Sequence, residues 1–297
     1  MSGLDRRTFL QSTAGLAAAQ LTLGGRGTSV LAADASAKSR AAKMRFGLVT
    51  YMWGADWDLP TLIANCEKAQ ALGVELRTEH AHGVDPEISN EKRVEVKKRF
   101  ADCPITLVGL GCNECFHHAD PKVLAASIAR AKQFIQLGHD VGGSGVKVKP
   151  NDLPKDVPQE KTVEQIGKSL NTLGAFAADL GQQLRLEVHG QCAPLPIIAS
   201  IMKVADHPNV RVCWNGNNQD LEGEGIEHNF HLVEKRLGDT LHAHDLGGKK
   251  YPYAKLFELL KDAHYQGWVL IEASDHPPDR VAALIEQRKI FEKLASA

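Results

Sequence analysis

The sequence lacks the features that would place the protein within a membrane, on nucleic acid or among disulfide-bonded scaffolds. No apolar run reaches the roughly 18 residues that a bilayer span requires. The 35 lysines and arginines are balanced by 36 aspartates and glutamates, which leaves a formal net charge of −1. We therefore expect no transmembrane segment in the mature chain and no nucleic-acid partner. Hydrophobic residues make up 43% of the 297 positions, which is typical of a soluble globular protein.

Cysteines are too sparse for a disulfide scaffold, since there are only six in the chain. Cys112 and Cys115 have the spacing of a redox or zinc motif, but no second pair completes a four-cysteine zinc site. We expect them to be loop thiols, with a disulfide after export as one alternative.

The N-terminus differs in character from the rest of the chain. Arg6 and Arg7 are followed by Phe9 and Leu10, a weakly apolar stretch, and small residues at 32–37. This pattern resembles a twin-arginine secretion signal, and the alternative is a disordered basic N-terminus. We interpret residues 1–37 as the signal and cleavage region and expect an exported, periplasmic protein.

From residue 44 onward, short β-branched runs alternate with longer amphipathic runs. Apolar residues at helical spacing mark the longer runs, and we expect Gly73 and Gly181 to end two of the helices. The expected strands are 45–51, 74–77, 105–110, 145–150, 186–190, 210–215, 241–245 and 269–274. The expected helices are 59–72, 90–100, 122–137, 162–180, 196–205, 226–237, 253–265 and 279–295.

This alternation decides the fold class. Strands that alternate with helices pair in parallel through right-handed crossovers, and eight such units over about 250 residues match a (β/α)8 barrel. A doubly wound sheet is the alternative, but no G-x-G-x-x-G follows the first strand. We predict an α/β protein in which residues 44–297 form one TIM-barrel domain.

The expected carboxyl ends of the strands are rich in carboxylates and imidazoles. In a barrel these ends meet at one rim, where active groups are found. Half-buried acidic and histidine side chains cost folding energy when unpaired, so such a rim suggests a function. The side chains are Arg77, His80, Lys147, Lys149, Glu187, His189, Asn215, Asn218, His242, His244 and Glu272.

Three of these strand ends carry a specific resemblance. Glu187-Val188-His189, His242-Ala243-His244-Asp245 and the glutamate at 272 resemble strands five, seven and eight of the sugar phosphate isomerase/epimerase superfamily, the xylose-isomerase-like barrels. The resemblance implies that Glu187, His242 and Glu272 bind one divalent metal ion (Mn²⁺, Mg²⁺ or Zn²⁺). It also implies that Glu187 and Glu272 transfer protons.

Strand six departs from the pattern of that superfamily. Its usual Asp-x-x-His is replaced by Asn215-Gly216-Asn217-Asn218. An amide oxygen can coordinate a hard cation but carries no charge, so metal affinity should fall. Three alternatives remain open: Asn215 is a neutral fourth ligand, His189 or His244 is recruited, or the metal is lost.

The other rim residues are expected to bind substrate. We assign this role to Trp53, Arg77, His80, Lys149, His189, Trp214, Asn218 and His244, with the two tryptophans forming the hydrophobic wall of a sugar site. Core filling is the alternative for the tryptophans. For Glu187, the alternative is a purely structural ion pair with Lys147 or Lys149, and Glu272 could likewise be structural. His242 and His244 share one strand face, so at least one should reach the lumen.

These residues favour a metal-assisted isomerase or epimerase that abstracts a proton next to a carbonyl. Export and the absence of a phosphate cradle favour a neutral sugar or keto-sugar as substrate. A lyase or hydrolase acting on keto-glycosides could use the same carboxylate pair, and a non-catalytic periplasmic sugar-binding barrel is a further alternative. The sequence leaves the oligomeric state open, a homo-oligomer included.

Overall fold

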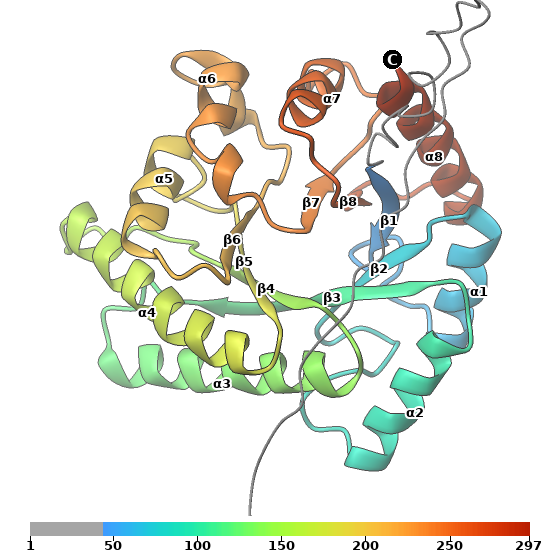
Figure 1. Cartoon of the computed structure of the whole chain (residues 1–297), viewed down its shortest axis with the longest axis horizontal. Coiled ribbons are helices and arrows are strands. Elements are labelled where there is room, and N and C mark those ends of the chain that lie inside the picture. Colours follow the sequence, from blue (N-terminus) through green and yellow to red (C-terminus); the bar gives the residue numbers. More distant parts are fainter. Residues whose placement is uncertain (1–43) are drawn as a thin grey trace, which may run out of the picture. The chain divides into compact units, whose positions relative to one another are not determined.

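Eight parallel strands and the helices between them make up residues 44–297, the part of the chain that the computed structural model describes (Figure 1). The strands lie at the centre and the helices surround them (Figure 1). The strands are β1 (Arg45–Val49), β2 (Gly73–Arg77), β3 (Thr106–Cys115), β4 (Gly145–Lys149), β5 (Gln183–Glu187), β6 (Val210–Cys213), β7 (Thr240–Ala243) and β8 (Trp268–Ile271). The expected secretion signal lies outside the described residues.

The helices follow the strands in turn, as the sequence predicted. They are α1 (Leu59–Ala69), α2 (Asn90–Ala101), α3 (Pro121–Asp140), α4 (Gln159–Asp179), α5 (Leu195–Val204), α6 (Gly225–His231), α7 (Tyr253–Asp262) and α8 (Arg280–Ser296). Two 3₁₀ helices, η1 (Asn218–Leu221) and η2 (Glu234–Arg236), flank α6. The helix expected at 226–237 is therefore split, because α6 ends at His231 and the chain tightens into η2. No helix among residues 44–297 is both long enough and apolar enough to cross a bilayer.

The sheet is a nearly closed barrel, which confirms the predicted fold class. Its strand order is β6-β5-β4-β3-β2-β1-β8-β7, with every pair parallel. β6 and β7 form no ladder. An isolated bridge joins Val212 of β6 to Leu237, which precedes β7, and a backbone hydrogen bond runs from His242 N to Trp214 O at 2.8 Å.

Alternation of apolar and polar residues along three of the strands places polar groups in the lumen. In β5 the sequence Gln-Leu-Arg-Leu-Glu buries Leu184 and Leu186 in the hydrophobic core, while Arg185 and Glu187 alternate with them and point into the barrel. Strands β2 and β4 follow the same pattern. In an open sheet, the polar face of β5 would lie towards solvent. In this barrel both of its faces are buried, one against the helices and one in the lumen.

Glycines make room for these long side chains. A Cβ at Gly109 would lie 2.9 Å from Arg185 Nη1, and one at Gly111 would lie 3.0 Å from Glu75 Oε1. Gly73 has a related function, which corrects the expectation that it caps α1. That helix ends at Gln70 in the left-handed conformation, whereas Gly73 begins β2, where a Cβ would lie 2.4 Å from the Trp268 ring.

The expectation of loop thiols is also wrong. Cys112 and Cys115 both lie within β3, which continues further than expected, and both are buried free thiols. Burial raises the pKa of the Cys112 thiol to about 12, so it is not an activated nucleophile. The two cysteines of this C-x-x-C motif are therefore residues of a strand and do not lie in a metal-binding or redox loop.

Asp220 in η1 anchors the segment that follows β6. Its Oδ2 accepts hydrogen bonds from the Tyr251 hydroxyl at 2.7 Å and from the Asn217 amide at 2.9 Å. The same Tyr251 hydroxyl accepts a hydrogen bond from the Trp214 indole at 2.9 Å. Burial raises the pKa of Asp220 to about 7, against the lowering effect of its two hydrogen bonds.

This raised pKa predicts a pH dependence of stability. Between the ordinary aspartate pKa and pH 7, folded Asp220 holds a proton that the unfolded chain has released, so its contribution to stability declines as pH rises through that window. The loss amounts to at most roughly 4 kcal/mol. Asp220→Asn keeps an acceptor oxygen but does not titrate. Urea unfolding at pH 5 and pH 8 should therefore show a smaller drop for the variant, and equal drops would contradict the assignment.

Candidate active site

Three side chains from separate strand ends converge at the carboxyl end of the barrel. Glu187 is the last residue of β5, His242 lies in β7, and Glu272 follows β8 directly. His242 Nδ1 is 3.5 Å from Glu187 Oε1 and 3.3 Å from Glu272 Oε2. Their exposed fractions are 1%, 0% and 5% in chain order from Glu187, so the cluster is almost removed from water.

Glu75 completes the surroundings of the imidazole. This carboxylate comes from the middle of β2, is fully buried, and has its Oε1 3.2 Å from His242 Nε2. Both ring nitrogens of His242 therefore face carboxylates. A carboxylate on the outer nitrogen of a histidine fixes the orientation of the ring and raises its basicity, so Glu75 directs Nδ1 towards the shared centre.

Glu187 is held from two sides. Its Oε2 lies 2.7 Å from the Nζ atom of Lys147, which is fully buried on the neighbouring strand β4. Its Oε1 accepts a hydrogen bond from Asn215 Nδ2 at 3.0 Å. The ion pair considered from the sequence thus exists with Lys147, and it coexists with the approach of Glu187 to His242.

A partly exposed cationic rim covers the cluster. Arg77, at the end of β2, lies 3.4 Å from Glu272 Oε1 through its Nη1 atom. Its Nη2 atom donates to Asn113 Oδ1 at 3.0 Å, and Lys149 Nζ donates to the same oxygen, also at 3.0 Å. The Arg77 guanidinium lies over the Tyr51 ring, 5.1 Å from its centroid. Two cations thus stand between the buried carboxylates and solvent.

The electrostatics keep the central groups ionised. Burial favours the neutral form of Glu187, but Lys147 and His242 outweigh it and hold the pKa of this carboxyl well below its usual range. Burial also opposes the charged form of His242, yet Cys213, Glu75 and Glu272 raise the pKa of the ring well above its usual value.

In Lys147 and Glu272, too, a neighbouring charge outweighs the effect of burial on the pKa. The pKa of Lys147 is raised because Glu187 outweighs burial. The pKa of Glu272 is lowered because His242 outweighs burial. Without a bound cation, a protonated His242 stands with Arg77 and Lys147 opposite the three carboxylates at 75, 187 and 272. A metal ion that binds through Nδ1 would displace the proton from that nitrogen.

The remaining histidines of the rim have partners outside the central cluster. His80 Nδ1 contacts Thr50 Oγ1 at 3.2 Å, and His189 Nδ1 contacts Asn151 Oδ1 at 2.9 Å. His244 Nδ1 contacts the backbone oxygen of Glu272 at 2.9 Å. Among the described residues, the grouping close enough to share one ion contains neither His189 nor His244.

The two tryptophans are buried. Trp214 is fully enclosed, packs on Phe230 with ring centroids 5.7 Å apart, and lies in the core behind the site instead of on its surface. Trp53 is 3% exposed and its indole donates to the Asp275 backbone oxygen at 3.1 Å, which ties the loop after β1 to the loop after β8. Asn218 is exposed at the start of η1.

The donor set fits a metal ion. One ligand atom each from Glu187, His242 and Glu272 lie within 4.8 Å of one another. Ligand atoms about 2.0–2.3 Å from a common ion are separated by roughly 3–4 Å, which the two His242 distances match. Asn215 Oδ1 is buried and has no hydrogen-bond partner among the described residues, so it is a candidate neutral ligand.

Sequence reasoning missed Glu75 and Asn113. The signal for Glu75 was the alternation Gly-Val-Glu-Leu-Arg in β2, in which the glutamate and Arg77 share one face. In a closed barrel that face of β2 is turned to the lumen, so its polar residues meet the polar residues of other strands there. Asn113 gave no such signal, because β3 was expected to end before it.

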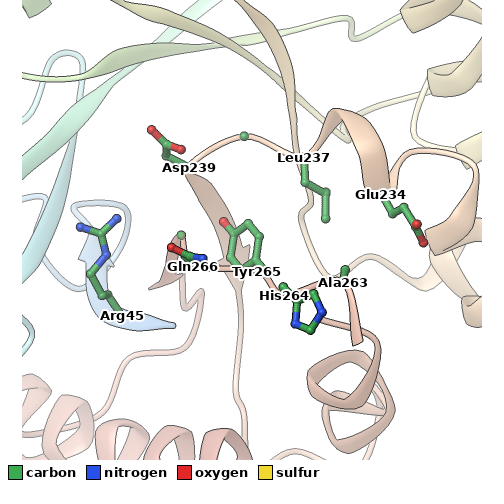
Figure 2. A pocket seen from close by; sticks show the side chains of 10 residues that line it. Arg45, Glu234, Leu237, Asp239, Ala263, His264, Tyr265 and Gln266 are labelled. Carbon is green, nitrogen blue, oxygen red and sulfur yellow. The ribbon is translucent and has the colours of Figure 1, made fainter. Parts of the chain in front are cut away.

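A cavity at the opposite end of the barrel is not part of this site. It has a volume of about 630 Å³ and is bounded by residues that precede β7 and β8 and by the start of β1. Figure 2 shows its side chains, with Tyr265 between Asp239 and His264. It therefore lies at the amino ends of the strands, whereas catalytic groups of TIM barrels come from the carboxyl ends. The full lining is Arg45, Glu234, Leu237, Gly238, Asp239, Ala263, His264, Tyr265, Gln266 and Gly267.

Solved structures of sugar epimerases share this fold. The apo form of the 3-keto-D-glucoside 4-epimerase YcjR from E. coli has a TM-score of 0.71 at 16% identity, covering 84% of this chain and 100% of that one. The D-allulose 3-epimerase from Methylomonas sp. has a TM-score of 0.72 at 16% identity, covering 85% and 98%. The D-psicose 3-epimerase from Clostridium cellulolyticum H10, solved with D-tagatose, has a TM-score of 0.67 at 19% identity, covering 85% and 96%.

Comparison with curated protein sequences gives no significant match. The likeness to the epimerase structures, at these identities, establishes the fold. The sequence profile of one family extends further, because it matches residues 63–294 and thus most of the barrel. The chain belongs to the xylose isomerase-like TIM barrel family.

Proposed function

We propose that the protein is a sugar isomerase or epimerase that moves a proton on the carbon next to a carbonyl. The observation that carries this proposal is the convergence of Glu187, His242 and Glu272 at the carboxyl end of the barrel. The epimerase structures with the same fold support the same class of reaction.

The two carboxylates act as proton acceptor and donor. Glu187 is kept ionised by Lys147, so it can accept a proton from carbon without first losing one. Glu272 reaches the same centre from the other side of His242. After it takes up a proton from solvent it donates that proton to the enediolate, while Glu187 releases the abstracted proton to solvent. Return to the opposite face gives an epimer, and return to the neighbouring carbon gives an isomer. Expulsion of a leaving group from the shared enediolate would make the enzyme a lyase.

A divalent cation would be held by Glu187, His242 and Glu272, with Asn215 as a fourth, neutral ligand. When bound, it would polarise the carbonyl and the adjacent hydroxyl and so acidify the carbon-bound proton. The chain's own cationic groups also favour negative charge here. Arg77, at the edge of the cluster, is positioned to bind substrate hydroxyls or a developing oxyanion.

We propose a neutral sugar, a keto-sugar or a keto-glycoside as the substrate, bound by the rim that Arg77, His80, Lys149, His189 and His244 form. These side chains are half-buried, polar and clustered above the carboxylates. The proposal includes export to the periplasm through the twin-arginine motif at Arg6 and Arg7, where such unphosphorylated sugars are available.

Solvent exchange tests the reaction. The protein, supplied with Mn²⁺ in deuterated water, should place deuterium next to the carbonyl in at least one of a panel of ketoses and 3-keto-glucosides. Glu187→Gln and Glu272→Gln should each slow this exchange by about 10²–10⁴-fold, because each removes a proton-transferring group. Mass spectrometry of the recovered sugar measures the label.

Glu114→Gln is the matched control, because this half-buried carboxylate lies one residue before the end of β3 and outside the cluster. It should exchange at the wild-type rate. Retained sugar binding by Glu187→Gln with lost exchange supports catalysis. Wild-type protein that binds a sugar of the panel but exchanges no deuterium would instead indicate a binding barrel.

The role of Glu75 is tested through metal affinity. Glu75→Gln removes the charge beside His242 Nε2, so the ring loses the partner that fixes its orientation. We expect Mn²⁺ or Zn²⁺ to bind about 10–100-fold more weakly to the variant in isothermal titration calorimetry. An unchanged affinity would mean that Glu75 does not support a metal-binding His242.

A further inference from the structure

Lys147 is the one lysine among residues 44–297 whose side chain is fully buried. It lies at the middle of β4 and extends into the lumen, where Gly111 on the neighbouring strand leaves room for its chain. A Cβ at Gly111 would lie 3.3 Å from Lys147 Cε. A buried ammonium is costly unless it is paired, and the atom it faces is Glu187 Oε2 at 2.7 Å.

The ion pair divides the two oxygens of Glu187 between two tasks. Oε2 faces Lys147, while Oε1 faces His242 Nδ1 at 3.5 Å and accepts from Asn215. Lys147 therefore sets the rotation of the carboxylate and directs Oε1 towards the centre that Glu272 also reaches. Lys147 contacts the Glu187 oxygen that does not face His242, so it acts through Glu187 and is a positioning residue.

The charges of the donor set are unusual for a divalent site. Glu187 and Glu272 contribute two negative charges, whereas Asn215 contributes none. The ammonium of Lys147, in contact with one of these ligands, offsets one of the two, which leaves a net charge of −1 for the ligands and Lys147 together. Affinity for hard cations rises with the negative charge of the ligands. Because this set carries little negative charge, its affinity for a divalent ion should be low.

We infer that Lys147 is a built-in counter-cation, which assembles Glu187 with His242 and Glu272 before any divalent ion binds and which lowers the affinity of the site for that ion. This inference rests on the proposed function in taking these three residues as the working site. Its consequence is a site whose geometry is independent of metal and whose metal, when present, is exchangeable.

Metal binding to Lys147→Met tests the inference. Full-length protein is stripped with chelator, and MnCl₂ is titrated by calorimetry. Removing a positive charge that contacts one of the ligands, Glu187, should tighten Mn²⁺ binding by about tenfold or more. Lys168→Met is the control, because Lys168 pairs with Glu164 on the exposed face of α4 and not with a residue of the cluster. Its affinity should change by less than about threefold. Equal or weaker Mn²⁺ binding by Lys147→Met would overturn the inference.

Thermal unfolding provides the second readout. At one fixed Mn²⁺ concentration, the melting temperature of the wild type should rise less than that of Lys147→Met, because the wild type binds the ion more weakly. Lys147→Met should melt lower in chelator and recover with Mn²⁺. A wild type that gains as much from Mn²⁺ as the variant does would contradict the counter-cation role.

A double variant keeps the test valid if Lys147→Met does not fold. Lys147→Met combined with Glu187→Gln removes both buried charges, so it should be more stable than Lys147→Met alone. A double variant no more stable than the single one would overturn the inference. The deuterium-exchange assay remains separate: failed exchange with these metal and melting results intact would remove the proposed reaction and leave the role of Lys147 standing.

Discussion

Charge balance in the lumen is the constraint on which the rest of this structure depends. Three carboxylates lie within hydrogen-bonding distance of shared partners inside the barrel, where like charges would otherwise suppress one another's ionisation. Lys147, His242 and Arg77, each from a different strand, lie beside them, and Lys147 and His242 lower the pKa values of Glu187 and Glu272. Removing one member leaves an uncompensated buried charge, which costs more than the pair itself contributes.

The barrel supplies the geometry that makes this balance possible. Long charged side chains fit in the lumen only where a neighbouring strand has no side chain, and Gly109 and Gly111 provide that space beside Arg185, Glu75 and Lys147. Two polar layers result. Arg185 occupies the layer nearer the amino ends, where it donates to the Val108 oxygen and to Ser144. The proposed site occupies the layer nearer the carboxyl ends.

The same arrangement connects the buried cluster to the surface. Arg77 contacts Glu272 inside and Asn113 outside, and Lys149 shares the same Asn113 oxygen. The proposed sugar substrate would therefore meet hydrogen-bond donors at the rim before it meets the carboxylates. The order of contacts, from partly exposed donors to ionised acceptors, matches the needs of a polyhydroxylated substrate whose acidic proton lies next to a carbonyl.

Much of the fold was predictable from the sequence because its signals are local. The eight alternating strand and helix patterns gave the barrel, and strand ends such as Glu187 and Glu272 gave two members of the cluster. Local signals failed where a contact from elsewhere in the barrel decides the outcome. Gly73 appeared to be a helix cap, but the Trp268 ring of β8 is what requires a glycine there.

The sequences of β2, β4 and β5 alone predict that polar residues share one face of each of these strands, since side chains alternate between faces with a period of two residues. Only the tertiary structure decided that these faces meet. Closing the sheet turns the polar faces of β2, β4 and β5 towards the same axis, so Glu75 reaches His242 from β2 and Lys147 reaches Glu187 from β4. Which of these side chains touch depends on the strand register and on the placement of the glycines, and neither can be read from a single strand.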